Sequence, residues 1–557
     1  MCGILFVTNP KDDSFRERLS TLKPRGPDET NIVVGENYIM GHTRNCITNP
    51  MNGKQPIQNE NWVLVHNGEI YNAPSLEYSY HSDSDWSDGD LSDNGMRDKT
   101  PDYSKKAQNG QSDSNYILTL LKEHGPLETP KHLDGIFAYV AYNVETGEYV
   151  AARDPIGVIP MYMAKEDGSV WFSSELKALK GCKNVEIVPP GHVVTADAVE
   201  RYTTPYATKP ERHVDCETEY NGIAWNTLKQ SVKKRLHLDV PYGVLLSGGL
   251  DSSAIASYIK LIRENEQVKT AWDGTIHTFS IGLEGSPDLR KARRMSIDVE
   301  SYHHEYIFTV EEGLEALRHV IYAIETYDVT TIRASVPMYL LGKYIRKCGV
   351  KVVFSGEGAD ELFGGYLYNK FCPSAEEMHA ECIKKMNRLH YHDCLRANKS
   401  MACHGIETRV PFLDKDFVDL IMNKFDPVDK LSHTHPEGKK KTKWYLRSLL
   451  RYDNEIPKKI LNREKEQFSD GVGNKWIHAL KQHAEETVKC FDKAKELYPY
   501  QTPQTKEAFL YREIFTELFG KDVDRTVFYT DETCACSSES ALKWNDSFVR
   551  DPSAKYV

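Results

Sequence analysis

The second residue of the chain is a cysteine, and residues that could assist a thiol nucleophile occur further along the chain. If Met1 is removed, Cys2 gains a free α-amine, a group with a pKa of about 7.7 to 8.0 that can act as general base for the neighbouring thiol. Asn67 and Gly68 follow an apolar segment, so a side-chain amide and a backbone N–H could stabilise an oxyanion. We therefore predict Cys2, Asn67 and Gly68 as catalytic residues of an acyl transfer.

Charged residues that could select the substrate of this nucleophile lie in the same half of the chain. Arg44 offers a planar guanidinium that can bind a carboxylate, and Glu69 and Asp113 can bind an ammonium group. An α-amino acid with a side-chain amide has these groups, and glutamine is such a substrate. The residues predicted to bind glutamine are Arg44, Asn67, Glu69 and Asp113.

A second candidate site is a loop rich in glycine and serine, Ser247-Gly248-Gly249-Leu250-Asp251-Ser252-Ser253, which follows an apolar segment ending at Leu246. The glycines let backbone N–H groups approach an anion, the serine hydroxyls add donors, and the following helix adds the partial positive charge of its N-terminus. The chain contains no Gly-x-x-x-x-Gly-Lys run, so this is not a Walker A loop. The pattern predicts a pyrophosphate-binding loop.

A second glycine-rich turn, Ser355-Gly356-Glu357-Gly358-Ala359-Asp360-Glu361, follows the apolar segment 350–354. We expect this turn at the carboxyl edge of the same sheet, where ligands of such sheets bind. Glu357 is the predicted general base. Asp251 and Asp360 are the predicted Mg²⁺ ligands, because a pyrophosphate leaving group needs neutralisation by a hard cation. One of the three carboxylates of this turn, Glu357, Asp360 and Glu361, could instead cap a helix N-terminus.

The elements that must position these residues form two groups. Short strands separated by turns predict packed antiparallel sheets in the first 200 residues, namely at 32–34, 38–43, 62–67, 136–143, 148–153, 169–173 and 192–195. Strands then alternate with helical patterns and predict a doubly wound parallel sheet, with strands at 242–246, 275–281, 303–308 and 350–354. A mainly helical region is expected after about residue 375.

The chain is therefore expected to form two domains, residues 1–205 and 215–557, with the boundary in the polar stretch near 205–215. Segment 79–111 is rich in Ser, Asp, Asn and Gly and has almost no aliphatic residues. It cannot bury enough apolar surface to order itself, so we predict a disordered surface insertion.

The composition of the 557 residues excludes several classes of protein. Lys and Arg number 70 against 81 Asp and Glu, a net charge of −11, so the chain lacks the basic field that binds nucleic acid. We find neither an apolar run of about 20 residues for a membrane helix nor a secretory signal, and therefore expect a cytoplasmic protein. The 12 cysteines are then expected to be mostly free thiols, and no Cys-x-x-Cys spacing indicates a zinc site.

Several runs in the first 200 residues resemble the class II glutamine amidotransferase domain, an N-terminal-nucleophile fold: Cys2-Gly3-Ile4, Arg25-Gly26-Pro27-Asp28, Arg44, Asn67-Gly68-Glu69 and Ser112-Asp113. The resemblance implies an antiparallel β sandwich flanked by helices, and hydrolysis of glutamine to glutamate and ammonia through a thioester. The loop from Ser247 to Ser253 resembles that of the PP-loop ATP pyrophosphatases. That resemblance implies ATP binding, with pyrophosphate leaving intact.

With both sites in one chain, the sequence resembles the glutamine-hydrolysing asparagine synthetases over nearly its full length, including the run Arg153-Asp154-Pro155-Ile156-Gly157. The implied reaction converts aspartate to aspartyl-AMP, which ammonia from the first domain attacks after moving along an internal path. Arg333 and Lys465 are implied ligands of aspartyl-AMP or pyrophosphate. ATP and Mg²⁺ are the implied cofactors. The implied ATP-binding residues are Leu246, Ser247, Gly248, Gly249, Asp251, Ser252, Ser253, Ile281, Ser355 and Gly356, with the adenine near Leu246, Ile281 and Gly356.

Two alternatives stay open at this point. A related amidotransferase could act on another carboxylate or close a lactam ring, although Cys2 argues against the lactam-forming relatives, which need no ammonia. A non-catalytic homologue is expected to lose a catalytic residue, yet Cys2, Asp251 and Glu357 are all present. The expected partners are the small molecules glutamine, aspartate and ATP, with no nucleic acid and no membrane, and a homodimer is the assembly considered.

Overall fold

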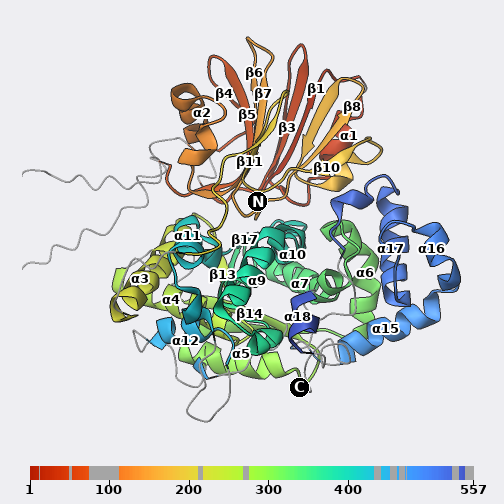
Figure 1. The fold of residues 1–557 in the computed structure, drawn as a ribbon. Helices are drawn as coiled ribbons and strands as arrows, with labels where there is room; N and C mark the ends of the chain where they lie inside the picture. Colours follow the sequence, from red (N-terminus) through yellow and green to blue (C-terminus); the bar gives the residue numbers. More distant parts are fainter. Residues whose placement is uncertain are drawn as a thin grey trace, which may run out of the picture.

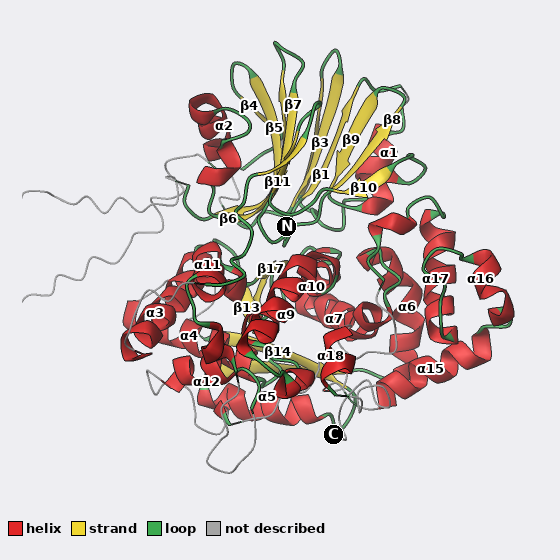
Figure 2. Cartoon of the chain, in the orientation of Figure 1, coloured by secondary structure: helices red, strands yellow, loops and turns green. Residues whose placement is uncertain are grey.

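The computed structural model describes residues 1–11, 13–48, 53–73, 112–210, 217–266, 275–431, 441–451, 461–462, 471, 473, 475–529 and 539–545. The chain forms two lobes that meet at the N-terminus (Figure 1). The first lobe consists mainly of strands, and the second is a sheet surrounded by helices (Figure 2). The predicted insertion at 79–111 lies outside the described residues.

The first lobe contains two six-stranded antiparallel sheets, with the orders β10-β8-β9-β1-β3-β2 and β12-β11-β7-β6-β5-β4. The strands of the first sheet are β1 (Gly3–Thr8), β2 (Glu29–Val34), β3 (Tyr38–Arg44), β8 (Tyr162–Glu166), β9 (Ser169–Ser173) and β10 (Val185–Ile187). Those of the second are β4 (Ile57–Gln58), β5 (Trp62–Ile70), β6 (Gly135–Asn143), β7 (Tyr149–Arg153), β11 (His192–Val194) and β12 (Val199–Arg201). The predicted sandwich of antiparallel sheets is confirmed.

Strand β1 is buried on both faces, which explains why its sequence does not alternate. The ring of Phe6 lies 6.0 Å from that of Tyr142 in the opposite sheet, between centroids. Leu5 belongs with Phe15 and Leu19 of α1 (Phe15–Ser20) to a second hydrophobic cluster. Strand β1 is not among the predicted strands, because a continuous apolar run does not show the alternation of a half-buried strand.

The second lobe contains a five-stranded parallel sheet in the order β15-β14-β13-β16-β17. Its strands are β13 (Tyr242–Leu245), β14 (Ile276–Gly282), β15 (Ser301–Ile307), β16 (Val352–Phe354) and β17 (Glu407–Arg409). The strand order reverses at β13, which pairs with β14 on one side and β16 on the other. Such a reversal opens a crevice at the carboxyl ends of the strands. The predicted parallel sheet is confirmed, while the three-residue strand β17 was not predicted.

Helices cover this sheet and extend from it (Figure 2). The α-helices of this lobe are α3 (Glu217–Arg235), α4 (Leu250–Glu266), α5 (Pro287–Asp298), α6 (Val310–Ile324), α7 (Val329–Lys347), α8 (Ala359–Phe363), α9 (Ala375–Arg388), α10 (Asp393–Ala402), α11 (Lys415–Asn423), α12 (Trp444–Arg451), α15 (Lys475–Thr487), α16 (Ala494–Leu497), α17 (Lys506–Phe519) and α18 (Glu539–Trp544). The first lobe adds α1 and α2 (Ser114–His124). Short 3-10 helices are η2 (Thr129–His132), η3 (Leu176–Leu179), η4 (Leu367–Phe371), η5 (Leu389–Tyr391), η6 (Pro411–Leu413), η7 (Pro427–Lys430), η8 (Phe491–Lys493) and η9 (Asp524–Thr526).

Helix α6 shows how local sequence determines an element. Thr309 and Glu312 form a capping box at its start, and Leu317, Val320 and Ile321 form its buried face. Its C-cap is Glu325, which adopts a left-handed conformation with a φ of 62°. In the part of the chain that the structure describes, no helix is both long and apolar enough to cross a membrane.

Candidate active sites

A cavity in the first lobe, where it meets the second lobe, collects the residues predicted for the thiol site. Five of the predicted residues line it: Cys2, Arg44, Gly68, Glu69 and Asp113. They come from the residue just before β1, from β3 and β5, and from the N-cap of α2. Glu407 of β17 also lines the cavity, so the second lobe supplies part of its wall.

The backbone of Cys2 is held by two side chains of the first lobe. The N–H of Cys2 donates to Asn67 Oδ1 at 2.7 Å, and Arg25 Nε donates to the carbonyl oxygen of Cys2 at 2.9 Å. Burial raises the pKa of the Cys2 thiol. The thiol therefore needs a base in order to act as a nucleophile at neutral pH.

Gly68 can only be a glycine at its position in β5. Its φ is 138°, and a Cβ atom there would lie 2.0 Å from the carbonyl oxygen of Ile136 on the paired strand. The residue therefore allows close backbone packing beside Cys2 and Asn67. Of the two predicted oxyanion donors, Asn67 contacts the backbone of Cys2 but is not among the described residues that line the cavity, and Gly68 lines the same cavity as Cys2.

Three charged side chains that line the same cavity are buried. Arg44, Glu69 and Asp113 are each at most 8% exposed. Glu69 Oε1 accepts from Thr48 Oγ1 at 3.0 Å and lies 3.2 Å from Arg409 Nη2 of the second lobe. Asp113 accepts from the N–H of Ile70 at 2.9 Å. The Asp113 carboxylate is thereby held at the cavity, although 33 residues of predicted insertion (79–111) precede Ser112.

The second lobe contains a cavity of about 220 Å³ at the carboxyl ends of β13, β14 and β16. Seven of the ten residues predicted to bind ATP line it: Leu246, Ser247, Asp251, Ser252, Ile281, Ser355 and Gly356. Glu357 and Asp360 line it as well. The two turns that sequence analysis singled out therefore share one site, because β13 and β16 are neighbours.

The other three predicted residues, Gly248, Gly249 and Ser253, are not among the described residues that line this cavity. A Cβ atom on Gly248 would lie 2.5 Å from the carbonyl carbon of Lys291 in α5, and its φ is 65°. The lack of a side chain at Gly248 thus permits the packing of α5 against the loop. Ser253 is fully buried at the start of α4.

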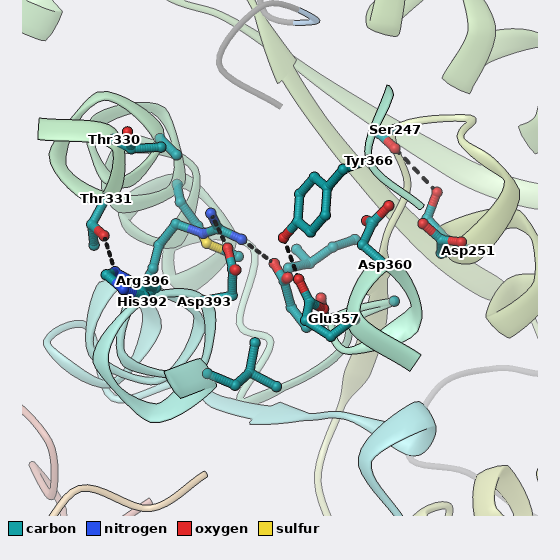
Figure 3. Close-up of a pocket in the computed structure, with 18 of the residues that line it drawn as sticks. Ser247, Asp251, Thr330, Thr331, Glu357, Asp360, Tyr366, His392, Asp393 and Arg396 are labelled. Atoms are coloured by element: carbon teal, nitrogen blue, oxygen red, sulfur yellow. Dashed lines mark hydrogen bonds and ion pairs between the residues drawn. The ribbon is translucent and has the colours of Figure 1, made fainter. Parts of the chain in front are cut away.

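Inside this cavity, Glu357 forms an ion pair that was not among the sequence predictions. Its Oε1 lies 2.6 Å from Arg396 Nη2 on α10, and Arg396 Nη1 lies 2.7 Å from Asp393 (Figure 3). The guanidinium thus holds the Glu357 carboxylate in a defined position. Asp393 and Arg396 are three residues apart, which places both on one face of a helix. This spacing was the sequence signal that could have predicted their ion pair.

Glu361, the last residue of the second glycine-rich turn, is another carboxyl group in this cavity and has no predicted catalytic role. It is 3% exposed and accepts a hydrogen bond from the hydroxyl of Tyr366. Burial and the negative charges of Asp393 and Asp360 raise the pKa of Glu361 to about 8. The group is therefore mainly protonated at neutral pH.

We expect the stability advantage of a Glu361→Gln variant to grow with pH. Because the folded-state pKa of about 8 lies above the ordinary value of 4.5, the contribution of Glu361 to wild-type stability is greatest below pH 4.5 and falls as pH rises toward 8. Glutamine does not ionise, so the variant should gain on the order of a few kcal/mol over this range. Thermal unfolding of the ligand-free protein at pH 5 and pH 8.5 measures the effect. The exposed Glu284 provides the control Glu284→Gln, and a pH-independent difference for Glu361→Gln would contradict the raised pKa.

The two predicted metal ligands converge on one cation. Lys443 Nζ lies 2.5 Å from Asp251 Oδ2 and 2.8 Å from Asp360 Oδ1. Carboxylates gathered around one positive charge fit a divalent cation as well. In the described ranges, no group of three or more His, Cys, Asp or Glu residues could hold a metal.

Arg333 is not among the described residues that line the second cavity. The Arg333 guanidinium donates two hydrogen bonds to Glu507, at 2.7 and 2.6 Å. Lys465, the other predicted ligand of the intermediate, lies outside the described residues. Other cationic side chains line the cavity from α9 and α10, namely Lys384, Lys385, Arg388 and Arg396.

Comparison with protein families divides the chain in the same way as its two lobes. Two models described as a glutamine amidotransferase domain match residues 1–90 and 87–181. A model described as asparagine synthase matches residues 225–377 and 369–544.

Curated relatives match all or nearly all of the chain. "Asparagine synthetase [glutamine-hydrolyzing] 2" of Oryza sativa subsp. japonica is 42% identical, covering 100% of this chain and 92% of the relative. "Asparagine synthetase [glutamine-hydrolyzing] 3" of Arabidopsis thaliana is 41% identical, covering 100% and 94%. "Probable asparagine synthetase [glutamine-hydrolyzing]" of Dictyostelium discoideum is 42% identical, covering 95% of each chain.

Proposed function

Because this chain belongs to the family of glutamine-hydrolysing asparagine synthetases, we propose that its two cavities carry out the two half-reactions of one synthesis. The chain is a ligase that uses ATP and nitrogen from glutamine to convert aspartate to asparagine. The observation that carries this proposal is that residues as distant in sequence as Cys2, Arg44 and Asp113 line one cavity. The names of these relatives do not favour another carboxylate substrate.

In the first cavity, Cys2 is the proposed nucleophile for glutamine. Met1 lines the cavity in this structure, so removal of Met1 is part of the proposal and frees the amine of Cys2 as the base. The thiolate attacks the side-chain amide carbon, Asn67 and Gly68 stabilise the oxyanion, and ammonia leaves. Water then hydrolyses the thioester to glutamate.

Three charged residues of the first cavity are the proposed ligands of the glutamine backbone groups. The Arg44 guanidinium binds the α-carboxylate, and Glu69 and Asp113 bind the α-ammonium. All three side chains are almost fully buried, so each retains a strong interaction with an oppositely charged substrate group.

In the second cavity, we assign the adenine to the neighbourhood of Leu246, Ile281 and Gly356 and the phosphates to the loop from Ser247 to Ser253. A β-carboxylate oxygen of aspartate attacks the α-phosphorus of ATP, and pyrophosphate leaves. Ammonia then attacks the aspartyl carbon, Glu357 accepts a proton, and AMP leaves. Free ammonia in water is mostly protonated at neutral pH and is then not a nucleophile. An internal path between the cavities, which the family resemblance implies, would deliver the ammonia unprotonated.

Magnesium is a proposed cofactor with Asp251 and Asp360 as its ligands, which fits the convergence of both carboxylates on Lys443 Nζ. When bound, Mg²⁺ would neutralise charge on the pyrophosphate. Arg333 and Lys465 stay predicted ligands of aspartyl-AMP or pyrophosphate, and Arg333 would have to leave Glu507 to reach them. The domain boundary near 205–215, the homodimer and the cytoplasmic location also stay predictions.

We expect AMP and pyrophosphate as products in a ratio of one to one with asparagine. The physical reason is that the loop from Ser247 to Ser253 lacks the lysine with which a Walker A loop reaches the β- and γ-phosphates. Phosphorus NMR of a reaction with ATP, Mg²⁺, aspartate and glutamine identifies the products. Stoichiometric ADP and inorganic phosphate would contradict the assignment of this loop.

A further inference from the structure

Helix α10 contacts residues of both candidate sites. Its Arg396 binds Glu357 in the second cavity at 2.6 Å, and two residues later Asn398 Oδ1 accepts from Arg25 Nη2 of the first lobe at 3.1 Å. Arg25 Nε in turn donates to the carbonyl oxygen of Cys2 at 2.9 Å. Arg396 and Asn398 of α10, together with Arg25, therefore connect the proposed base to the backbone of the proposed nucleophile.

The Arg25 guanidinium is fully buried, so its position is determined by its partners. Besides Cys2 and Asn398, it contacts Glu175 of the first lobe, at 2.8 Å from Nη1 to Oε1, and Met1 Sδ, at 3.7 Å from Nη2. Removal of Met1 would leave Cys2, Glu175 and Asn398 as its partners. Asn398 is 1% exposed, and its Nδ2 also donates to the carbonyl oxygen of Val158 at 3.0 Å. The second lobe therefore supplies one of the acceptors that orient Arg25.

A buried ion network joins α10 to the first lobe a second time. Lys177 Nζ lies 2.5 Å from Glu175 Oε2 and 3.0 Å from Oε1 of Glu325 in the second lobe. Glu325 also forms an ion pair with Lys399, the residue after Asn398 on α10. The carboxylate of Glu325 further accepts from the backbone N–H groups of Leu176 and Lys177, at 2.8 and 2.7 Å.

This network has little freedom to rearrange. None of its charged side chains is more than 6% exposed, and an uncompensated charge at such a place is strongly disfavoured. The network therefore holds α10 and the first lobe at a defined separation. The contact between Asn398 and Arg25 depends on that separation.

We propose that Asn398, supported by the Glu325–Lys399 pair, positions Arg25 and through it Cys2, so that the second lobe determines the efficiency of glutamine hydrolysis in the first. Asn398 is absent from the described residues that line either cavity, and it is therefore a positioning residue. The inference rests on the proposed role of Cys2 as the nucleophile for glutamine.

The test compares Asn398→Leu with the wild-type enzyme in two assays, glutamine hydrolysis and asparagine synthesis from an ammonium salt. A displacement of about 1 Å at a reacting group can lower a rate by roughly 100-fold. We expect kcat for glutamine hydrolysis to fall about 10- to 100-fold, with a change in the glutamine KM of less than about twofold. The KM is preserved because Arg44, Glu69 and Asp113 are untouched. Synthesis from ammonium should stay within about twofold of wild type.

Further variants separate positioning from loss of folding. Asn398→Asp keeps an acceptor for Arg25 but loses the donor to Val158, so it should recover part of the lost kcat. Asn398→Ser leaves a small polar side chain too short to reach Arg25, and it serves if the leucine variant does not fold. Ser400→Ala, at a buried position in the same helix, is the matched control and should behave as wild type in both assays.

The outcomes distinguish this inference from the proposed function. An unchanged kcat for glutamine hydrolysis in folded Asn398→Leu and Asn398→Ser would overturn the positioning role. Equal losses in both assays, without recovery in Asn398→Asp, would overturn it too, because a general loss of structure then explains the effect. A wild-type enzyme that fails to hydrolyse glutamine would instead overturn the proposed function.

Discussion

Replacing Cys2 with alanine is expected to abolish glutamine-dependent synthesis of asparagine while synthesis from an ammonium salt survives. The thiol lines only the cavity of the first lobe, and the product of that cavity, ammonia, can be supplied from solution. Removal of a nucleophile typically removes several orders of magnitude of rate, roughly 10⁶-fold in a well-studied hydrolase. Asparagine formation with glutamine and with ammonium, measured side by side, gives the two rates.

The matched control for this experiment is Cys46→Ala. Cys46 lies two residues after Arg44 but is not among the described residues that line the cavity. Its removal should leave both activities near wild type. If a folded Cys2→Ala protein lost ammonium-dependent synthesis to the same extent as glutamine-dependent synthesis, the division of the reaction between the two lobes would be wrong.

Replacing Glu357 with glutamine is expected to stop synthesis at the aspartyl-AMP stage. General-base assistance is typically worth about 10²- to 10⁴-fold, and glutamine keeps the shape of the side chain without its proton-accepting carboxylate. The variant should therefore still exchange pyrophosphate into ATP in the presence of aspartate. It should make little asparagine from either nitrogen source, while glutamine hydrolysis at Cys2 continues.

The contact with Arg396 makes this substitution informative. Arg396 still binds Asp393 in the variant, and the glutamine oxygen can accept from the same guanidinium, so the cavity should keep its form. Glu284→Gln, at an exposed position, is the control for the loss of one negative charge. Loss of the exchange reaction would assign Glu357 to ATP or Mg²⁺ binding, and normal asparagine formation would remove it from the catalytic residues.

Local sequence determined the elements and turns that carry the two sites. The predicted strands of the first lobe correspond to β2, β3, β5, β6, β7, β9 and β11, with ends that differ by no more than three residues. These strands alternate or end at clear turn residues, and both properties are local. The glycine-rich turns after β13 and β16 could be recognised for the same reason, since a run of small and acidic residues after an apolar strand restricts the backbone locally.

The partners of the site residues depend on contacts between distant parts of the chain. Arg333 was predicted to bind the intermediate, yet its guanidinium binds Glu507, 174 residues away. Lys443, which joins Asp251 and Asp360, lies 192 residues after Asp251. A long charged side chain at one position gives no local sign of which carboxylate it will meet, because that choice depends on how the helices pack.

The amino-acid sequence by itself determined which groups are the candidates for the chemistry, namely Cys2, the Asn67-Gly68-Glu69 run and the two glycine-rich turns, because residue type and local spacing define what a group can do. Only the tertiary structure decided that β17 and α10 of the second lobe contribute Glu407 and Asn398 to the surroundings of Cys2. Short segments such as β17, with three residues, carry no periodic signal of their own. They are placed by sheet pairing and by buried ion pairs formed across hundreds of residues, and these interactions exist only once the two lobes have folded against each other.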